Sequence, residues 1–341
     1  HYALKANVNK PILKIIKENG FGADCVSGNE VKRALESGFA PEDIVFAGVG
    51  KTDEEINYAL DQHIFAFNCE SVQELEIINE MAETKGVTAR VALRLNPNVD
   101  PETHQYITTG LSDNKFGISL AGLENIFENH RRWKHLTIEG IHFHIGSQGT
   151  KMEKYRELSE RVNGLIDHFE EQGIALKYVN LGGGLGINYE APEDNPIAPF
   201  AEYFNVFKTH LKIRPDLAVH FELGRSLVGQ SGSLITRVLY TKEGENTNFL
   251  IVDGGMTELL RPALYQAYHK IISLTSEKTD KRYDVVGPIC ETSDFFGKNV
   301  ALSESTRGDL IAILSAGAYA EVMSSSYNLR DKAKAYYSNS L

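Results

Sequence analysis

A lysine close to the start of the sequence is the first residue that could do chemistry. Lys5 ends the apolar run YALKA, and it shares one face of a predicted strand with Ala3 because side chains alternate along a strand. A lysine that points into an apolar interior has a lowered pKa, since burial disfavours the ammonium. Such an amine can attack a carbonyl and form a Schiff base. The plain alternative is a surface lysine that ends a strand.

A cluster of glycines follows the apolar run YVNL. Gly182, Gly183, Gly184 and Gly186 would let backbone N–H groups approach a phosphate closely. The cluster is not a dinucleotide-binding motif, because Ile187 replaces the last glycine of GxGxxG, and no lysine completes a Walker motif. Two interpretations of the glycine cluster remain: a site for a single phosphate, or a tight turn between a strand and a helix.

A carboxylate completes this set of chemical groups. Glu222 ends another apolar run, and Gly224 and Arg225 follow it and would extend a phosphate site. Glu222 could simply pair with the amine of Lys5. An inward lysine, a phosphate site and a carboxylate together suit pyridoxal phosphate, which presents an aldehyde, a phosphate and a ring nitrogen. The carboxylate would keep that nitrogen protonated, which makes the ring a strong electron sink.

Two histidines, His142 and His144, lie two residues apart and therefore face the same way along a strand. One use of that geometry is an aromatic ring beside a cofactor. The other is metal binding, since HxH is a ligand pair in barrel hydrolases. That class has HxH early in the barrel and further histidines at strand ends. Here the pair comes late, and among later histidines only His220 lies in a predicted strand, so we predict no metal.

These residues need a scaffold that brings strand ends together. Apolar runs rich in β-forming residues recur over residues 1–230, and most are followed by a segment with helical spacing. The eight runs are YALKA from Tyr2, ADCV from Ala23, IVFAG from Ile44, IFAFN from Ile64, VALRLN from Val91, IEGIHFHI from Ile138, YVNLGG from Tyr178 and AVHFELG from Ala218. Eight such units predict a (β/α)8 TIM barrel, whose reactive groups lie at the C-terminal ends of its strands. An open doubly wound sheet is the alternative, and the strand count alone separates the two.

Residues 231–341 show a different pattern of short strands separated by turns, with little helical spacing. One helix is predicted from Pro262 to Ile272. We therefore expect an α/β protein in which the barrel domain of residues 1–230 is followed by a smaller, mainly β domain.

The composition excludes several classes of protein. The 341 residues include 35 Lys and Arg against 46 Asp and Glu, and a net charge of −11 argues against a nucleic-acid partner, whose phosphates require basic residues. No stretch approaches the roughly 20 apolar residues of a membrane-spanning helix, and the first residues lack the apolar segment of a signal peptide. The three cysteines form no CxxC pair. We expect a cytoplasmic protein with neither a membrane nor a nucleic-acid partner.

Seven motifs resemble, in order, those of the fold-type III pyridoxal-phosphate-dependent decarboxylases, a family with an alanine racemase-like barrel. They are YALKAN, HFHIGSQ, GGGLG, ELGRS, RPALYQAYH, CETSD and GAYA. The resemblance covers nearly the whole chain. One departure is Leu223, which replaces the proline of the usual EPGR and leaves both charged residues in place. Family members also carry residues before the lysine strand and a longer C-terminus, and we expect both to be missing from this sequence.

The resemblance implies a role for each matched residue. Lys5 is similar to the lysine that forms the Schiff base, His144 to the residue stacked on the cofactor ring, and Glu222 to the partner of the ring nitrogen. The phosphate-side residues implied are Ser147, Gly184, Gly224, Arg225 and Tyr319. Cys290 resembles the cysteine that enters from the other subunit and protonates the carbanion, which implies a homodimer with shared active sites.

The charged residues indicate a substrate. Ornithine, lysine and arginine end in a bare cation, so a distal arginine would not help to bind them. The sequence most closely resembles family members that act on meso-2,6-diaminopimelate, whose far end carries a carboxylate and an ammonium. The residues expected to bind the carboxylate are Arg225, Arg261 and Tyr265, and Glu291 is expected to bind the ammonium. Tyr319 is expected to be a further substrate-binding residue.

The expected reaction is therefore decarboxylation of meso-2,6-diaminopimelate to L-lysine and CO2. Decarboxylation of ornithine, arginine, lysine or carboxynorspermidine is the alternative within the family. A racemase would need a second base, usually a tyrosine, where this chain has Cys290. A metal-dependent hydrolase and a non-enzymatic cofactor carrier are the more distant alternatives, and the presence of both Lys5 and Cys290 argues against the carrier.

Overall fold

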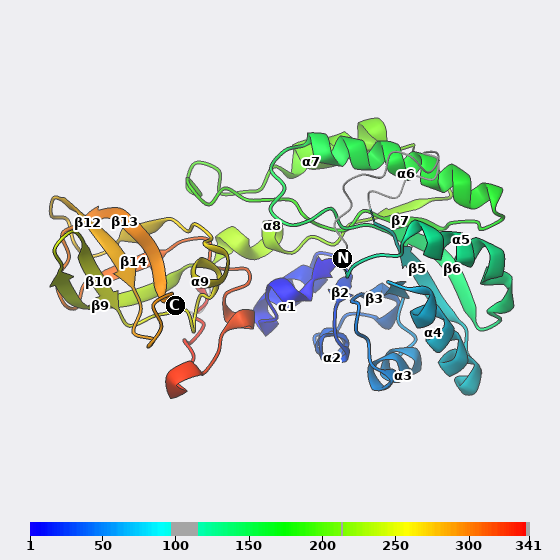
Figure 1. Cartoon of the computed structure of the whole chain (residues 1–341), viewed down its shortest axis with the longest axis horizontal. Helices are drawn as coiled ribbons and strands as arrows, with labels where there is room; N and C mark the ends of the chain where they lie inside the picture. The colour runs from blue at the N-terminus through cyan, green and yellow to red at the C-terminus, as the bar shows by residue number, and fades with distance from the viewer. Residues whose placement is uncertain (97–114, 213, 339–341) are drawn as a thin grey trace. The chain divides into compact units, whose positions relative to one another are not determined.

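The chain divides into two structural units, and the computed structural model describes residues 1–96, 115–212 and 214–338. His1–Gly186 and Pro199–Leu223 form the first, here called the barrel unit. Ile187–Ala198 and Gly224–Leu341 form the second, here called the β unit. The short segment Ile187–Ala198 thus leaves the barrel unit after the glycine cluster and the chain returns to it at Pro199. Figure 1 labels the elements of both units.

Parallel strands form the centre of the barrel unit. Among the residues that the structure describes, eight strands pair in the order β1 to β8, each parallel to the next. They are β1 (Tyr2–Ala3), β2 (Ala23–Cys25), β3 (Ile44–Phe46), β4 (Ala66–Cys69), β5 (Ala89–Arg94), β6 (Leu136–His142), β7 (Tyr178–Asn180) and β8 (Ala218–His220). A parallel bridge between Tyr2 and Leu223 joins the chain after β8 back to β1. The predicted (β/α)8 barrel is confirmed.

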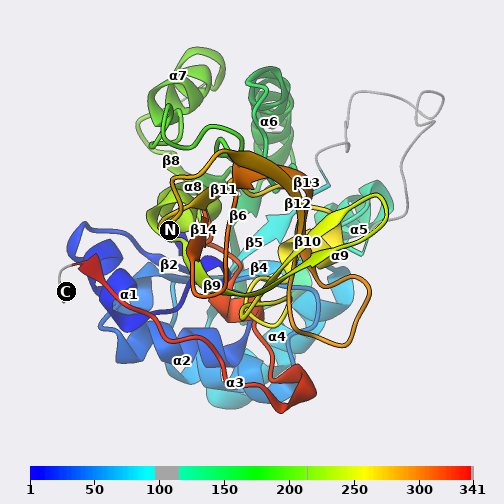
Figure 2. The same cartoon turned by 90° about the vertical axis from the view of Figure 1, so that its left-hand side faces the viewer.

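Helices cover the outside of these strands (Figure 1). They are α1 (Lys10–Glu18), α2 (Gly28–Glu36), α3 (Asp53–Asp61), α4 (Val72–Lys85), α5 (Leu120–Asn129), α6 (Glu153–Glu171) and α7 (Phe200–His210), with short 3-10 turns η1 (Leu4–Ala6), η2 (Pro41–Asp43) and η3 (His130–Arg132). Their starts are set by the sequence, because a Ser or Thr side chain caps several of them by accepting a backbone N–H. The capping residues are Ser27, Thr52, Ser71 and Ser119. Helices α6 and α7 pack side by side (Figure 2).

The first strand is shorter than the sequence predicts. It ends at Ala3, and Leu4–Ala6 form a 3-10 turn that is closed by a hydrogen bond from the Asn7 N–H to the Leu4 carbonyl at 3.0 Å. Lys5 therefore lies in the turn directly after the strand and not at the end of the strand. The prediction was wrong at this point because the backbone of this turn bonds to itself rather than to β2.

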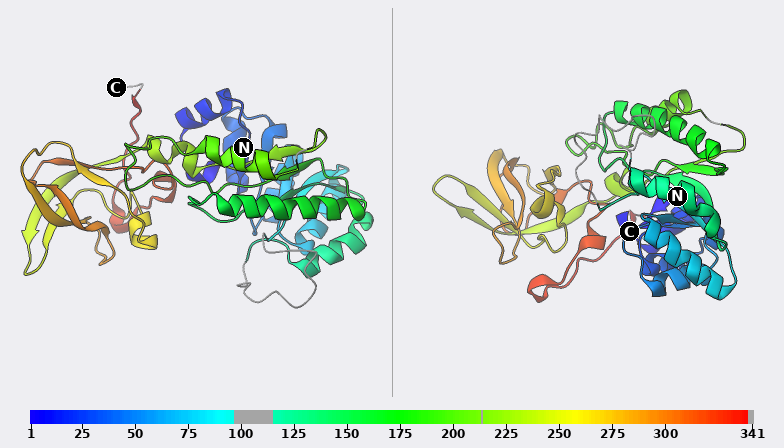
Figure 3. Two further views of the ribbon diagram at one scale, coloured as in Figure 1. Left: turned by 90° about the horizontal axis from the view of Figure 1, so that it is seen from above. Right: turned by 45° about the vertical axis from the view of Figure 1, so that its right-hand side comes forward.

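A six-stranded sheet forms the β unit within the part of the chain that the structure describes, in the order β11-β14-β9-β10-β12-β13. Its strands are drawn in yellow-green to orange in Figure 3. The strands are β9 (Leu234–Glu243), β10 (Asn248–Val252), β11 (Ile271–Ser273), β12 (Asp280–Val286), β13 (Phe295–Ser303) and β14 (Leu310–Ile313). The helical segments are α8 (Arg225–Val228), η4 (Gly229–Ser231), α9 (Arg261–Tyr265), η5 (Glu321–Met323) and η6 (Tyr327–Leu329). Apolar side chains from the sheet form its core, including Val238, Leu250, Val252, Tyr283, Val285, Ile311 and Ile313.

One predicted helix of this unit is wrong in its second half. The helix expected from Pro262 to Ile272 ends at Tyr265, where Gln266 adopts a left-handed conformation with φ of 53°. Ile271 already belongs to β11, which pairs with β14. Pairing with a strand far away in the sequence overrides the local helical pattern. No helix in the described ranges is long and apolar enough to cross a membrane.

Candidate active site

The barrel unit contains a cavity of about 780 Å³, a size typical of small-molecule sites. Three of the predicted site residues line it, namely Lys5, His144 and Glu222. Lys5 follows the first strand of the sheet, whereas His144 and Glu222 follow β6 and β8, so closure of the sheet, which joins β8 to β1, brings them together. The cavity thus lies at the C-terminal ends of the strands, where barrels carry their reactive groups. Other residues that line it include Arg94, Asn96 and His142.

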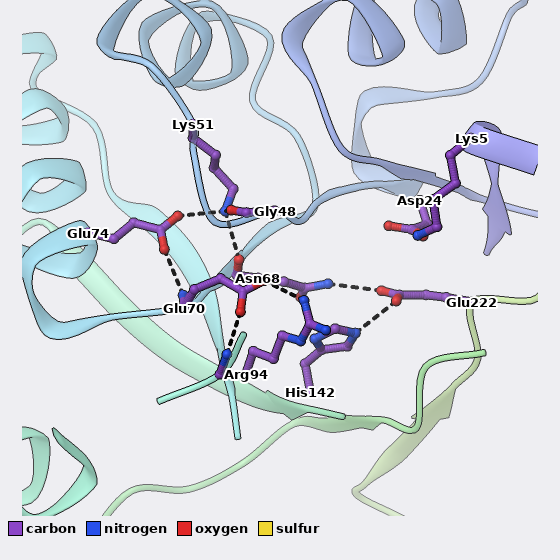
Figure 4. A network of polar contacts seen from close by, with 11 residues as sticks. Lys5, Asp24, Gly48, Lys51, Asn68, Glu70, Glu74, Arg94, His142 and Glu222 are labelled. Carbon is purple, nitrogen blue, oxygen red and sulfur yellow. Dashed lines mark hydrogen bonds and ion pairs between the residues drawn. The ribbon is translucent and has the colours of Figure 1, made fainter. Parts of the chain in front are cut away.

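Lys5 contacts a buried acid that the sequence analysis missed. Its Nζ lies 3.3 Å from Oδ2 of Asp24, whose side chain is fully buried, whereas the Lys5 side chain is 40% exposed (Figure 4). Burial raises the pKa of Asp24, the charge of Glu222 raises it further, and Lys5 opposes both. Within the described residues, Oδ1 of Asp24 has no hydrogen-bond partner. An acid in the middle of the short apolar strand β2 was the signal that could have identified it.

Glu222 is a buried carboxylate held by three donors (Figure 4). Its Oε1 accepts from Nδ2 of Asn68 at 2.9 Å and from Nδ2 of Asn180 at 2.7 Å, and its Oε2 bonds to Nε2 of His142 at 2.8 Å. Burial alone would raise the pKa of Glu222, but His142, Lys5 and Asn180 outweigh burial and hold that pKa below its usual value. The group is therefore an anion, which suits a protonated ring nitrogen.

The two histidines of the HxH pair have different surroundings. His142 is buried and its Nε2 faces Glu222. Burial, together with the positive charges of Lys5 and Arg94, lowers the pKa of His144 to about 4. His144 is thus a neutral aromatic ring in the cavity wall at physiological pH. Within the described ranges, no group of three or more His, Cys, Asp or Glu side chains is placed to hold a metal ion.

A buried lysine supports one wall of the cavity. The side chain of Lys51 is 1% exposed, and its Nζ donates to the carbonyls of Gly48 at 2.9 Å and Asn68 at 2.8 Å and to Oε1 of Glu74 at 2.6 Å (Figure 4). All three donors of the ammonium are satisfied, which offsets the cost of burying it. These bonds join the loop after β3 to the end of β4. The backbone of Asn68 is fixed in this way while its side chain reaches Glu222.

The glycine cluster allows close approach between backbone segments. A Cβ on Gly184 would lie 2.5 Å from the carbonyl oxygen of Gly146, and Gly182 and Gly184 have φ values of 67° and 110°. Only glycine adopts such angles without strain. Gly146 lines the cavity and precedes Ser147, so Gly184 and the Ser147 loop adjoin the cavity wall. These glycines therefore form the tight turn that was one of the two alternatives predicted from the sequence.

Four more predicted site residues lie in the β unit, namely Gly224, Arg225, Arg261 and Tyr319. Gly224 precedes α8, and Arg225 is the first residue of that helix. Nη1 of Arg225 donates to the hydroxyl of Tyr189 at 2.6 Å, and its guanidinium lies 4.8 Å from the ring centre of Tyr319. The guanidinium of Arg261 lies 4.8 Å from the ring centre of Tyr189. Sequence reasoning missed Tyr189, which contacts both arginines.

The other predicted site residues of the β unit are exposed. Tyr265 is 63% exposed at the end of α9, and Cys290 and Glu291 are exposed in the loop before β13. The Cys290 N–H donates to Oδ1 of Asn328 at 3.0 Å, and the Tyr327 hydroxyl donates to Oε1 of Glu291 at 2.6 Å. The segment around η6 therefore holds this loop in place.

Comparison with known proteins gives the family of the chain. Residues 1–229 match the model of the family described as "Pyridoxal-dependent decarboxylase, pyridoxal binding domain". The chain belongs to the pyridoxal-dependent decarboxylases. It is 52% identical to the diaminopimelate decarboxylase of Bacteroides thetaiotaomicron over 341 residues, which is 100% of this chain and 88% of that protein. It is 45% identical to the diaminopimelate decarboxylase of Aquifex aeolicus over 97% of this chain and 79% of that protein.

Solved structures of this family are similar to the chain as well. Diaminopimelate decarboxylase from Helicobacter pylori, complexed with L-lysine, matches with a TM-score of 0.84 and 42% identity over 96% of this chain and 81% of that one. The enzyme from M. jannaschii, also in complex with L-lysine, matches with a TM-score of 0.85 and 38% identity over 96% and 77%. The chain is thus a decarboxylase that uses pyridoxal 5'-phosphate, as the sequence predicted.

The cavity fits this cofactor. It offers an amine on Lys5, a neutral ring on His144 and an ionised carboxylate on Glu222, which match an aldehyde, an aromatic ring and a ring nitrogen. Among the described residues that line the cavity, Lys5 is the one lysine and Glu222 is the one acid.

Proposed function

We propose that this chain decarboxylates meso-2,6-diaminopimelate to L-lysine and CO2. The observation that carries the proposal is the single cavity that Lys5, His144 and Glu222 line. The relatives named diaminopimelate decarboxylase, at 52% and 45% identity, support the substrate. The L-lysine bound in the Helicobacter pylori relative matches the proposed product.

Lys5 binds the cofactor covalently through its ε-amine in this proposal, His144 contacts the cofactor ring, and Glu222 accepts a hydrogen bond from the ring nitrogen. Bound pyridoxal phosphate supplies an electron sink for the electron pair left when CO2 departs. Glu222 is suited to its role because its three donors keep it ionised inside the barrel. Asp24 is placed to hold the Lys5 ammonium whenever that amine is not bonded to the cofactor. The phosphate-side residues proposed are Ser147, Gly184, Gly224, Arg225 and Tyr319.

The far end of the substrate carries a carboxylate and an ammonium. We assign the carboxylate to Arg225, Arg261 and Tyr265, because a guanidinium binds a carboxylate through two parallel hydrogen bonds. Tyr319 is assigned to the substrate as well. Tyr189 of the β unit contacts the guanidinium groups of Arg225 and Arg261, and the guanidinium of Arg225 also lies over the ring of Tyr319, which supports the assignment. Glu291 is assigned to the ammonium.

Cys290 of a second copy of the chain is proposed to donate a proton to the carbon that lost CO2. This requires a homodimer in which each active site contains residues of both copies. The exposure of Cys290 and Glu291 supports the idea, since both side chains are available to another subunit. In this arrangement residues 1–230 form the cofactor-binding barrel domain, and residues 231–341 form the mainly β domain that completes the site.

The test is a reconstituted assay with purified protein and pyridoxal phosphate. Release of CO2 and L-lysine from meso-2,6-diaminopimelate is expected, with little release from ornithine, arginine, lysine or carboxynorspermidine. Preference for one of those four would replace the proposed substrate. Lys5→Ala should remove both turnover and the visible absorbance of the bound cofactor, whereas the control Lys10→Ala, at an exposed position of α1, should change neither. Normal CO2 release from Lys5→Ala would refute the role of this lysine.

Substitutions in the β unit test the distal site separately. Arg261→Ala and Glu291→Gln should weaken turnover of meso-2,6-diaminopimelate far more than cofactor binding, because each leaves one substrate charge unpaired. A gain of ornithine turnover in Arg261→Ala would support the charge argument. Unchanged kinetics in both variants would place the distal site elsewhere.

A further inference from the structure

The guanidinium of Arg261 is buried without a carboxylate partner among the described residues. Arg261 is 7% exposed, and its guanidinium contacts Nε2 of His269 at 2.6 Å and the ring of Tyr189. Buried arginines are ordinarily paired with an acid, because an uncompensated charge in the interior is costly. This charge is therefore available to an incoming anion.

His269 is held in one protonation state and one orientation. It is 1% exposed, its Nδ1 bonds to the carbonyl oxygen of Leu314 at 2.8 Å, and its Nε2 bonds to Arg261. A carbonyl can only accept and a guanidinium can only donate, so Nδ1 carries the proton and Nε2 accepts. Burial and the positive charges of Arg261 and Arg225 lower the pKa of His269 to about 4 despite the bond to Leu314. The imidazole is thus a neutral acceptor.

The anchor of this histidine is the sheet of the β unit. Leu314 directly follows β14, and its N–H donates to the carbonyl of Lys270 at 2.8 Å, which extends the pairing of β11 with β14. His269 lies just before β11 and its ring packs edge-on against Tyr189, with ring centres 4.9 Å apart. The orientation of Arg261 is therefore transmitted from a regular sheet through a single imidazole.

A neutral acceptor does what an acid in the same place could not. Glutamate or aspartate would also orient Arg261, but its negative charge would cancel the positive charge that an anionic ligand needs. The hydroxyl of Tyr189 likewise accepts a hydrogen bond from the guanidinium of Arg225.

We propose that His269 is a positioning residue, which orients Arg261 toward the distal carboxylate of the substrate and leaves the charge of Arg261 uncompensated. The proposal rests on the proposed function, which assigns that carboxylate to Arg261. It makes His269 a determinant of specificity for substrates that carry a distal carboxylate over diamines and amino acids that end in a bare cation.

The test uses the holoenzyme with the variants His269→Leu, His269→Gln and His269→Glu. Their kcat and KM for meso-2,6-diaminopimelate are measured, together with inhibition by L-lysine and by 1,5-diaminopentane, which is lysine without its carboxylate. The Leu variant should raise KM and the inhibition constant of L-lysine by about tenfold or more, with kcat within about threefold and inhibition by the diamine unchanged. The Gln variant, whose amide oxygen can accept from Arg261, should stay within about threefold of the unsubstituted enzyme. The Glu variant should bind L-lysine at least as weakly as the Leu variant.

Two outcomes would overturn the proposal. Unchanged KM and L-lysine inhibition in the Leu and Glu variants would mean that His269 does not control Arg261. Equal losses of kcat, L-lysine binding and diamine binding in all three variants would mean a general structural role. Failure of the unsubstituted enzyme to act on meso-2,6-diaminopimelate is a separate result, since it contradicts the proposed function before any variant is compared.

Discussion

The three hydrogen bonds that hold Glu222 lead to a prediction with a defined size. His142→Leu replaces the buried imidazole with an apolar side chain of similar volume. The substitution removes the hydrogen-bond donor that lies 2.8 Å from Oε2 of Glu222. A hydrogen bond to a charged group contributes about 1.5–3 kcal/mol, so the free energy of unfolding of the barrel unit should fall by about 2 kcal/mol at pH 7. The Glu222 carboxylate would keep Asn68 and Asn180 as donors, which is why the expected loss is partial.

The loss of unfolding free energy in His142→Leu should be smaller at acidic pH than at neutral pH. The pKa of Glu222 is lowered in the folded protein, so its ionised form stabilises the fold above the pKa of an unfolded glutamate, and that contribution disappears as pH falls through the lower folded pKa. In the Leu variant the pKa of Glu222 should lie closer to its ordinary value. The difference between the two proteins should therefore be largest at neutral pH and shrink below about pH 4.3, the ordinary glutamate pKa.

Urea unfolding of the holoenzyme at one protein concentration measures this difference. Trp133 is the single tryptophan of the sequence, and it is 6% exposed in the barrel unit, so its fluorescence reports on that unit. His142→Gln is the matched control, because its amide nitrogen can still donate to Glu222, and it should lose less than half as much stability. If the Leu and Gln variants both unfold within about 0.5 kcal/mol of the unsubstituted protein, the reasoning about Glu222 is wrong.

Three further predictions concern other parts of the chain. Lys51→Met should lower the free energy of unfolding by about 3–5 kcal/mol in the same urea assay, because it leaves the Glu74 carboxylate without its buried cation. A loss below about 1 kcal/mol would contradict this prediction. Gly184→Ala should reduce the yield of folded, cofactor-binding protein, since its Cβ would lie 2.5 Å from a carbonyl oxygen at a φ of 110°; normal yield and absorbance would contradict this. Cys290→Ala should lose turnover but keep the cofactor absorbance. Mixing this variant with an equal amount of Lys5→Ala should restore about a quarter of the activity, because half of the randomly formed dimers contain one of each variant and regain one of their two sites. No recovery after subunit exchange would contradict the shared active site.

Much of the barrel unit could be predicted from the sequence. Each βα unit is encoded locally, by apolar spacing and by capping residues such as Ser27 and Thr52. In the structure each of the eight predicted strands begins within two residues of its predicted start, although several of them end earlier than predicted. The order of parallel strands then follows from the order of the units. Lys5, His144 and Glu222 were predicted to share a pocket because barrels place strand ends at one face, and they do line one cavity.

The partners of these residues depended on the tertiary structure. Glu222 bonds to Asn68, 154 residues earlier, and to His142, 80 residues earlier, and no local pattern relates such positions. The same holds for Asp24, which the sequence placed in a strand but not beside Lys5. In the β unit, a local helical pattern led to a wrong prediction for residues 266–272, because pairing of β11 with β14 determines that segment.

The sequence by itself thus determined the barrel, the cofactor and the residue types of the site. The tertiary structure alone decided which donors keep Glu222 charged and which neutral acceptor orients Arg261. The physical reason is the range of the interactions. Helical spacing and caps act over a few residues, whereas the charge state of a buried group depends on every atom that the closed fold places around it.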